Sequence, residues 1–273
     1  MFTLGVALAA ASCAMVEAAP AEGGVFFYSE EGDTDRFGEL SLPEAVTVAD
    51  EALPVIVLIH GGFWQSTFEL DLMTPLVSSL TERGFAVWNI EYHRVGQTGG
   101  GYPGTLHDVA SAVDYLSTLG DDLPLDLSDV TIVGHSAGGH LGLWAASRGS
   151  LPAEAPGADP VIEPSLVIGQ AAVTDLFDAA QQGLGRFAVQ SFIGAEPHQN
   201  EGAYRIAQPI VGAVPTVLVH GDLDFVVPID QSTRHEELAA VDVVVVEGED
   251  HFAALDPTSR SWAAVLEAVE SRS

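Results

Sequence analysis

The chain has 273 residues, of which 47% are hydrophobic, and its 39 Asp and Glu residues face only 9 basic residues, all of them arginine. The net charge of -30 repels phosphate groups, which excludes nucleic acid and anionic membranes as expected partners. This length and apolar content predict one globular domain with a large core. Because dissolved salt screens self-repulsion, so acidic a chain also suggests a high-salt habitat.

Residues 1–24 form an apolar, alanine-rich segment that we expect to lie outside a single domain of residues 25–273. The segment resembles part of a secretory signal, but no basic residue precedes Arg36. Two interpretations stay open: a disordered start of a cytoplasmic protein, which is our expectation, or a signal for secretion. Cys13 is the sole cysteine, so no disulfide can form within the chain.

From Val55 onward, short β-branched runs alternate with amphipathic segments, a pattern typical of βαβ units around a parallel sheet. The expected elements of the first half are strands at 55–59 and 85–92, a helix over 70–82, a helix capped by Thr105 that extends to about Leu119, and candidate edge strands at 25–28 and 46–48. The uninterrupted apolar run of residues 55–59 indicates a strand that is buried on both faces.

The second half continues the alternation, and one of its junctions is unusually tight. We expect strands at 129–133, 166–169, 214–219 and 241–246, with helices over 136–147 and 258–271. Only Gly134 and His135 separate the strand at 129–133 from the helix that follows. The segment of about 171–208 has no strong period and predicts a short cap insertion. The chain is thus predicted to be α/β, with a mostly parallel central sheet, helices on both faces and a cap.

The tight junction carries Gly134-His135-Ser136-Ala137-Gly138, a G-x-S-x-G pattern. In such a strand-to-helix turn the strained backbone pushes the serine hydroxyl clear of the sheet, and the flanking glycines leave room for the turn. Ser136 is therefore the candidate nucleophile. The alternative is a glycine-rich helix start at which the Ser136 hydroxyl caps a free N–H group.

A second pattern, His60-Gly61-Gly62-Phe63-Trp64, follows the strand at 55–59. Backbone N–H donors stabilise the oxyanion of a tetrahedral intermediate by ~3 to 4 kcal/mol each. We assign the donors to Gly62 and Phe63, together with Ala137 at a helix N-terminus. Phe63 and Trp64 are alternatively core aromatics. Three further residues are candidate substrate contacts: Trp64, His135 and Phe192.

The candidate acid and base lie at the ends of two later strands. Asp224 in His220-Gly-Asp222-Leu-Asp224 is the preferred acid, and Asp222 is then a turn residue. His251 follows the strand at 241–246 in a short loop, and a histidine can accept the serine proton when an acid holds its tautomer. The alternative for His251 is a solvated loop residue. No spacing of His, Asp and Glu indicates a metal site, and no cofactor is expected.

From about Phe37 onward the chain resembles the α/β-hydrolase superfamily, and within it the esterase and arylformamidase (kynurenine formamidase) group with an H-G-G-x-W oxyanion motif. The resemblance implies that Ser136, Asp224 and His251 form the triad. It implies hydrolysis of a small carboxylic ester through an acyl-enzyme, with arylformamidase activity as the alternative. A ligand-binding protein that keeps the fold without turnover is a third interpretation. The expected partner is a small-molecule ester or amide, and the oligomeric state stays open.

Overall fold

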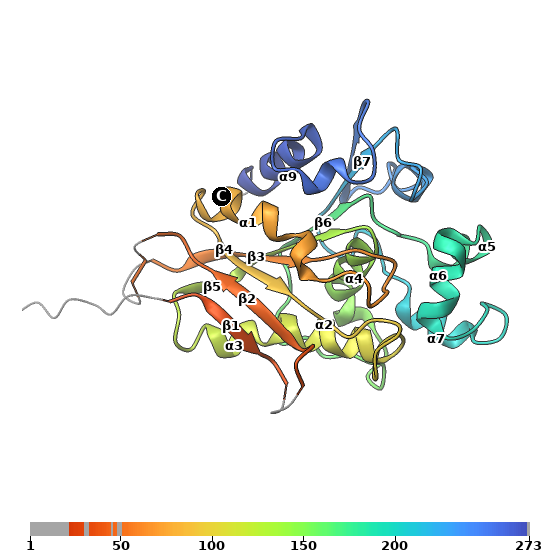
Figure 1. Ribbon diagram of the computed structural model, residues 1–273, viewed down its shortest axis with the longest axis horizontal. Coiled ribbons are helices and arrows are strands. Elements are labelled where there is room, and N and C mark those ends of the chain that lie inside the picture. The colour runs from red at the N-terminus through yellow and green to blue at the C-terminus, as the bar shows by residue number, and fades with distance from the viewer. Residues whose placement is uncertain (1–21, 30–32, 45, 48–50, 272–273) are drawn as a thin grey trace, which may run out of the picture.

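A computed structural model describes residues 22–29, 33–44, 46–47 and 51–271, and the expected signal-like segment falls mostly outside them. Eight strands form one sheet in the order β1-β2-β4-β3-β5-β6-β7-β8 (Figure 1). The strands are β1 (Gly24–Phe27), β2 (Phe37–Ser41), β3 (Leu53–Ile59), β4 (Ala86–Ile90), β5 (Leu125–His135), β6 (Leu166–Gln170), β7 (Thr216–Gly221) and β8 (Val241–Val246). Strand β2 pairs antiparallel with β1 and β4, and every other pairing is parallel.

Helices cover both faces of the sheet, which explains why its central strands are apolar without alternation. All residues of β4 and β6 are buried. In Figure 1, α1 (Thr74–Thr81) and α9 (Arg260–Glu270) lie above the sheet, and α2 (Gly104–Asp114) and α3 (Leu116–Leu119) lie below it. The buried side chains divide accordingly into two clusters, and α4 (Ala137–Ala146) belongs to the cluster that contains α2.

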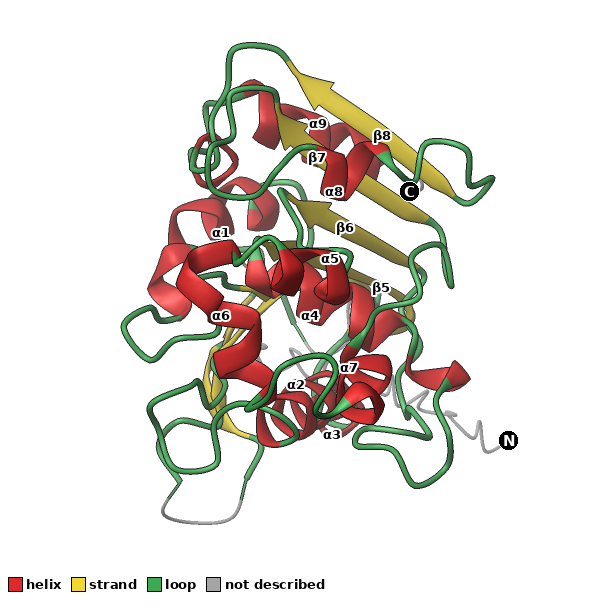
Figure 2. Cartoon of the chain, turned by 90° about the vertical axis from the view of Figure 1, so that its right-hand side faces the viewer, coloured by secondary structure: helices red, strands yellow, loops and turns green. Residues whose placement is uncertain are grey.

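The segment between β6 and β7, where the cap is expected, folds into α5 (Leu176–Gln181), α6 (Leu184–Ile193) and α7 (Glu201–Ala207). These helices lie together at the right of Figure 1, opposite the β1–β2 hairpin, and face the viewer in Figure 2. The short helix α8 (Asp230–Thr233) follows β7. Short 3-10 turns lie at Leu70–Leu72, Arg148–Ser150 and Ala253–Leu255. Within the described ranges, no helix is both long and apolar enough to cross a bilayer.

The α/β fold class is confirmed, and the local differences have physical reasons. The edge strand β1 is followed in the sheet by β2, which the sequence did not predict, and the expected edge strand at 46–48 falls partly outside the described residues, since residue 48 is not among them. Thr105 does not cap α2: its hydroxyl is buried, accepts a hydrogen bond from the Gly101 N–H (3.0 Å) and donates to the His93 carbonyl (2.5 Å). Pro103 takes the N-cap position, since a proline has no N–H to satisfy there.

Candidate active site

Ser136 stands on a strained turn between β5 and α4, with φ +56° and ψ -117°. A Cβ atom on Gly134 would lie 2.3 Å from the Gly138 carbonyl oxygen, and one on Gly138 would lie 2.1 Å from the Ile59 carbonyl oxygen. Neither position therefore accepts a side chain. The Ser136 hydroxyl makes no capping hydrogen bond to α4, so the helix-cap interpretation is wrong. The Ser136 N–H donates to the Gln170 carbonyl (2.8 Å), which ties the turn to the end of β6.

His251 and Asp224, from loops after β8 and β7, meet at 2.7 Å between Nδ1 and Oδ2. The Asp224 side chain is fully buried, and its Oδ1 accepts the N–H groups of Val226 and Val227, both at 2.8 Å. Burial raises the pKa of Asp224, but the hydrogen bonds from His220 and His251 outweigh burial and hold this pKa well below its usual value. Asp224 is therefore ionised and positioned to keep the Nδ1 proton on His251.

A second histidine, His220, also contacts Asp224, which sequence reasoning did not predict. Its Nε2 lies 3.1 Å from Asp224 Oδ2, and its Nδ1 lies 2.8 Å from the Ser232 hydroxyl. Asp222, the competing acid, instead accepts the Gly248 N–H at 2.5 Å and is exposed. The structure thus gives Asp222 a role in the turn and leaves Asp224 as the acid that faces the histidine.

Ser136 and His251 line one small cavity of about 50 Å³. The other lining residues are Gly62, Phe63, Phe68, Leu72, His135, Val226, Phe252 and Leu255. Apart from Ser136 and the two histidines, this lining offers no polar side chain. The cavity is suited to an uncharged, apolar group held beside the serine hydroxyl. Phe68, Leu72, Val226 and Leu255 were not predicted, because apolar residues near a site look like core residues in a sequence.

Of the predicted oxyanion donors, Gly62 and Phe63 line this cavity and Ala137 directly follows Ser136, and within the described ranges none of their N–H groups has a protein acceptor. Gly62 and Phe63 both adopt positive φ, of 108° and 54°. The Gly62 carbonyl accepts the Gln65 N–H at 3.0 Å, which fixes the turn that carries Phe63. Ala137 is the first residue of α4, where the helix dipole favours an anion. The loop and the helix start therefore supply unpaired donors at the site of the serine.

Trp64 and Phe192 do not line the cavity, so their expected contact with substrate is corrected to a packing role. Both are buried, and their rings stack at 4.9 Å. The Trp64 indole N–H donates to His140 Nδ1 at 3.2 Å. Trp64 has φ +57°, and the ring packs against Phe192 of α6. Sequence alone could not distinguish this packing from a contact with substrate.

His135 lines the cavity, but its protonation state limits what it can do. Its Nε2 lies 2.9 Å from the His251 carbonyl, and its Nδ1 has no partner in the described structure. Complete burial and, to a lesser extent, the nearby His251 lower the pKa of His135 to about 3. His135 is therefore neutral near pH 7. It supports the backbone of His251 and presents an acceptor nitrogen.

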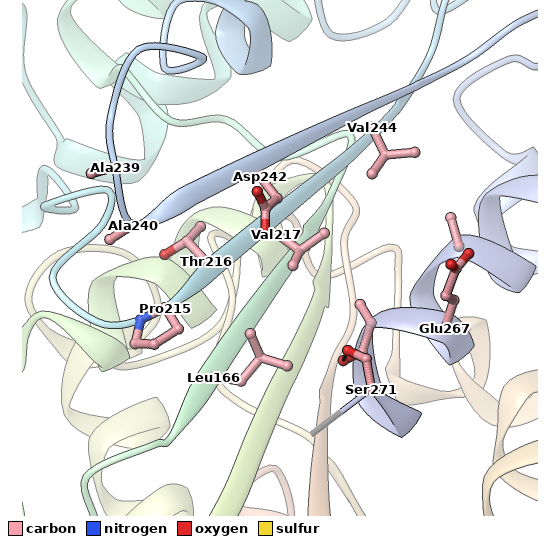
Figure 3. A pocket seen from close by; sticks show the side chains of 12 residues that line it. Leu166, Pro215, Thr216, Val217, Ala239, Ala240, Asp242, Val244, Glu267 and Ser271 are labelled. Carbon is pink, nitrogen blue, oxygen red and sulfur yellow. Dashed lines mark hydrogen bonds between the residues drawn. The ribbon is translucent and has the colours of Figure 1, made fainter. Parts of the chain in front are cut away.

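Two other features lie apart from this cavity. A larger groove of about 710 Å³ is lined by residues of β6, β7 and β8, by α9 and by Ser271 after it; Leu166 and Thr216 are among these residues (Figure 3). Ligands of open α/β sheets bind at the opposite, carboxyl ends of the strands. Asp33, Asp35 and His93 also gather ligand atoms within 4.8 Å of one another. Sequence spacing missed this cluster because His93 is distant in the chain, and the cluster lines a different pocket from Ser136.

Comparisons with known proteins agree with this fold. Esterase LipQ of Mycobacterium tuberculosis is 28% identical over 190 residues, which cover 66% of this chain and 44% of LipQ. Esterase LipC of the same organism is 27% identical over 205 residues, 69% of this chain and 49% of LipC. The chain thus spans about half the length of these curated relatives. Their names give the arylformamidase alternative no support.

Among solved structures, esterase B of Lactobacillus rhamnosis superposes with a TM-score of 0.76 at 19% identity, covering 93% of this chain and 87% of that one. That crystal structure contains a tributyrin phosphonate inhibitor. These values establish a shared α/β-hydrolase fold. A family model named BD-FAE matches residues 41–238. Since this match spans well over half of the sequence, the chain belongs to the BD-FAE family of α/β-hydrolase-like proteins.

Proposed function

We propose that the protein is a serine carboxylesterase that cleaves small esters of short-chain acids through an acyl-enzyme. The observation that carries the proposal is the 2.7 Å contact of His251 Nδ1 with the buried Asp224, made by a histidine that shares a cavity with Ser136. A hydroxyl, an imidazole and a carboxylate in this arrangement are the parts of a nucleophilic acyl-transfer site. The esterase relatives support the same reaction class.

In the proposed mechanism, Ser136 Oγ attacks the ester carbonyl carbon while His251 Nε2 accepts the hydroxyl proton. The carbonyl oxygen becomes an oxyanion that accepts hydrogen bonds from N–H groups of Gly62, Phe63 and Ala137. When the intermediate collapses, the bond to the alcohol oxygen breaks and His251 returns the proton to that oxygen. Water then repeats these steps on the acyl-enzyme, which releases the acid and restores the Ser136 hydroxyl.

The size of the cavity supports a short acyl group. Since on the order of 10–15 Å³ is needed to hold one water molecule, a cavity of about 50 Å³ accepts only a few non-hydrogen atoms. The apolar side chains of Leu72, Val226 and Leu255 complete its wall. Esterase B, which shares the fold, is inhibited by a tributyrin phosphonate and so accommodates a four-carbon acyl analogue. We therefore propose acetate to butyrate esters as substrates.

Hydrolysis of p-nitrophenyl acetate and butyrate tests the proposal, with N-formylkynurenine in the same panel. The expected result is turnover of both esters that falls by about 10⁴-fold or more in Ser136→Ala. A preference for N-formylkynurenine would replace the esterase with an arylformamidase. Absence of turnover on the whole panel by folded protein would favour the ligand-binding interpretation, and full activity of Ser136→Ala would refute the serine mechanism.

A further inference from the structure

His60, which immediately precedes Gly61 and Gly62, is completely buried and has an acceptor at each ring nitrogen. Nδ1 lies 2.8 Å from the Gly61 carbonyl oxygen, and Nε2 lies 3.0 Å from Oε1 of Glu91. A neutral imidazole has a proton on only one nitrogen, and a carbonyl oxygen cannot donate. The two contacts are therefore satisfied together only if His60 is doubly protonated or if Glu91 carries a proton.

The remaining contacts of Glu91 exclude a protonated carboxyl group. Its Oε2 accepts the Leu70 N–H at 3.0 Å, and its Oε1 accepts the Tyr92 N–H at 2.9 Å and lies 3.2 Å from Arg94 Nη1. Each of these three neighbours is a hydrogen-bond donor, so a proton on the carboxyl group would face donors and not acceptors. Burial raises the pKa of Glu91, but the hydrogen bond and charge of His60 and the charge of Arg94 lower it below its usual value. The shared proton accordingly resides on His60.

The groups packed around this pair complete its electrostatic balance. The Arg94 guanidinium is buried and lies 3.8 Å from Asp35. The Tyr92 ring stacks on His60 at a centroid distance of 4.4 Å, and its hydroxyl donates to the His60 carbonyl at 2.8 Å. The Tyr28 hydroxyl donates to the Glu91 carbonyl. A buried charge persists when it is paired and hydrogen-bonded, as His60 is here.

The His60 contact also fixes the direction of one oxyanion donor. The Gly61–Gly62 peptide is trans, so its C=O and N–H groups point in opposite directions. Because His60 Nδ1 holds the Gly61 oxygen on one side, the Gly62 N–H points to the other, and Gly62 borders the cavity of Ser136. We infer that His60 is an imidazolium, held by Glu91, that orients the Gly62 N–H as a positioning residue of the oxyanion loop. The role of that N–H rests on the proposed function.

The charge state is measured directly by nitrogen NMR of protein with 15N-labelled histidine rings, with His60→Asn to assign the His60 signals. We expect both ring nitrogens of His60 to stay protonated up to about pH 9, whereas an ordinary histidine is neutral above about pH 7.5. A neutral ring at about pH 7 would overturn the inference. The readout does not depend on catalysis, so it separates failure of this inference from failure of the esterase proposal.

Two substitutions at His60 test the positioning role. Asparagine places an amide N–H near the position of Nδ1, whereas leucine has no donor. We expect His60→Leu to lower kcat by about 100-fold with KM within about threefold, since a displaced donor acts on the transition state. His60→Asn should retain much more of kcat, with a loss below about 10-fold. Equal losses in folded His60→Asn and His60→Leu would contradict the role.

Replacing the Glu91 carboxylate should change how kcat depends on pH, which a merely structural role of His60 would not predict. In the unmodified enzyme, kcat should stay level on the alkaline side, because Glu91 keeps the charge on His60. In Glu91→Gln, burial and Arg94 oppose the charge on His60, so His60 loses its proton as pH rises and kcat falls again on the alkaline side. Asp114→Asn, which removes the carboxylate bound to the buried Arg148, is the matched control and should keep the level profile. A level profile in folded Glu91→Gln would overturn the inference, and if that variant does not fold, the NMR measurement decides.

Discussion

Addition of a single methyl group at Gly138 tests how closely the serine turn packs against the oxyanion loop. The new Cβ would lie 2.1 Å from the Ile59 carbonyl oxygen and 2.4 Å from the His60 carbonyl oxygen. Both contacts are with backbone at the end of β3, so neither can be relieved by rotation of a side chain. Gly138→Ala must therefore separate α4 from the strand that leads into the loop of Gly62.

Two opposing effects set the magnitude. Alanine in place of a helical glycine favours folding by up to ~1 kcal/mol, while overpacking a core typically costs ~1–3 kcal/mol and occasionally more. Since the clash is with two backbone carbonyls, we expect a cost in the upper part of that range. After the gain in helix propensity is subtracted, Gly138→Ala should lower the free energy of unfolding by about 2 kcal/mol. A shift of about 1 Å in the oxyanion donors should also lower kcat by up to 100-fold.

Urea unfolding and ester hydrolysis measure the two effects, with Gly202→Ala as the matched control. Gly202 is also helical, in α7, but it is exposed and its added Cβ would meet no heavy atom closer than 3.9 Å. The control should gain up to ~1 kcal/mol of stability and keep full activity. A Gly138→Ala variant as stable and as active as Gly202→Ala would refute the packing argument.

Four further predictions follow from the same structure. Asp224→Asn should lower kcat by ~10⁴-fold, as expected when the tautomer of a catalytic histidine is no longer held. Because the folded-state pKa of Asp224 is depressed, this carboxylate stabilises the fold above about pH 4, and the stabilisation disappears as pH falls. In Asp224→Asn the free energy of unfolding should therefore fall less steeply as the pH is lowered below about 4. The same steepness as in the unmodified protein would argue against this role of Asp224. Burial lowers the pKa of His140 to about 4, so the contribution of the neutral ring to the free energy of unfolding should be fully present above about pH 6.5 and should decrease toward pH 4. His140→Gln should reduce this decrease, which urea unfolding at about pH 6.5 and about pH 4 measures. Leu255→Ala should enlarge the cavity and raise kcat/KM for p-nitrophenyl octanoate relative to acetate, and a constant ratio would count against an acyl site there. With a net charge of -30, the melting temperature should rise with NaCl up to about 1 M, and a flat or falling curve would contradict a high-salt habitat.

The sequence predicted the elements well where local pattern and burial agree. The residues of β8 coincide with the expected strand at 241–246, and β3 extends the expected strand at 55–59 by two residues. Parallel strands buried on both faces have a distinctive apolar run, so their positions follow from composition alone. The tight junction at Ser136 was also recognisable, because only two residues separate the predicted strand from the predicted helix and few backbone conformations can connect them.

What the sequence did not reveal are contacts between side chains that lie far apart in the chain. His220 lies near the end of β7 and Glu91 directly follows β4, but no local pattern shows that His220 contacts Asp224 or that Glu91 contacts His60. Trp64 and Phe192 do not line the cavity of Ser136, because their rings pack on each other. Such pairings depend on strand order and on loop conformations at positive φ, which residue type alone does not determine.

The central claim is that a single serine attacks the substrate carbonyl beside preformed N–H donors. A crystal structure of the protein inactivated by a short-chain alkyl phosphonate, a stable analogue of the tetrahedral intermediate, tests it most directly. We predict one covalent bond, from phosphorus to Ser136 Oγ, with a phosphoryl oxygen within hydrogen-bond distance of the Gly62, Phe63 and Ala137 N–H groups and His251 Nε2 facing Oγ. A phosphonate bound to another residue, or a Ser136 adduct whose oxygens point away from these donors, would contradict the account.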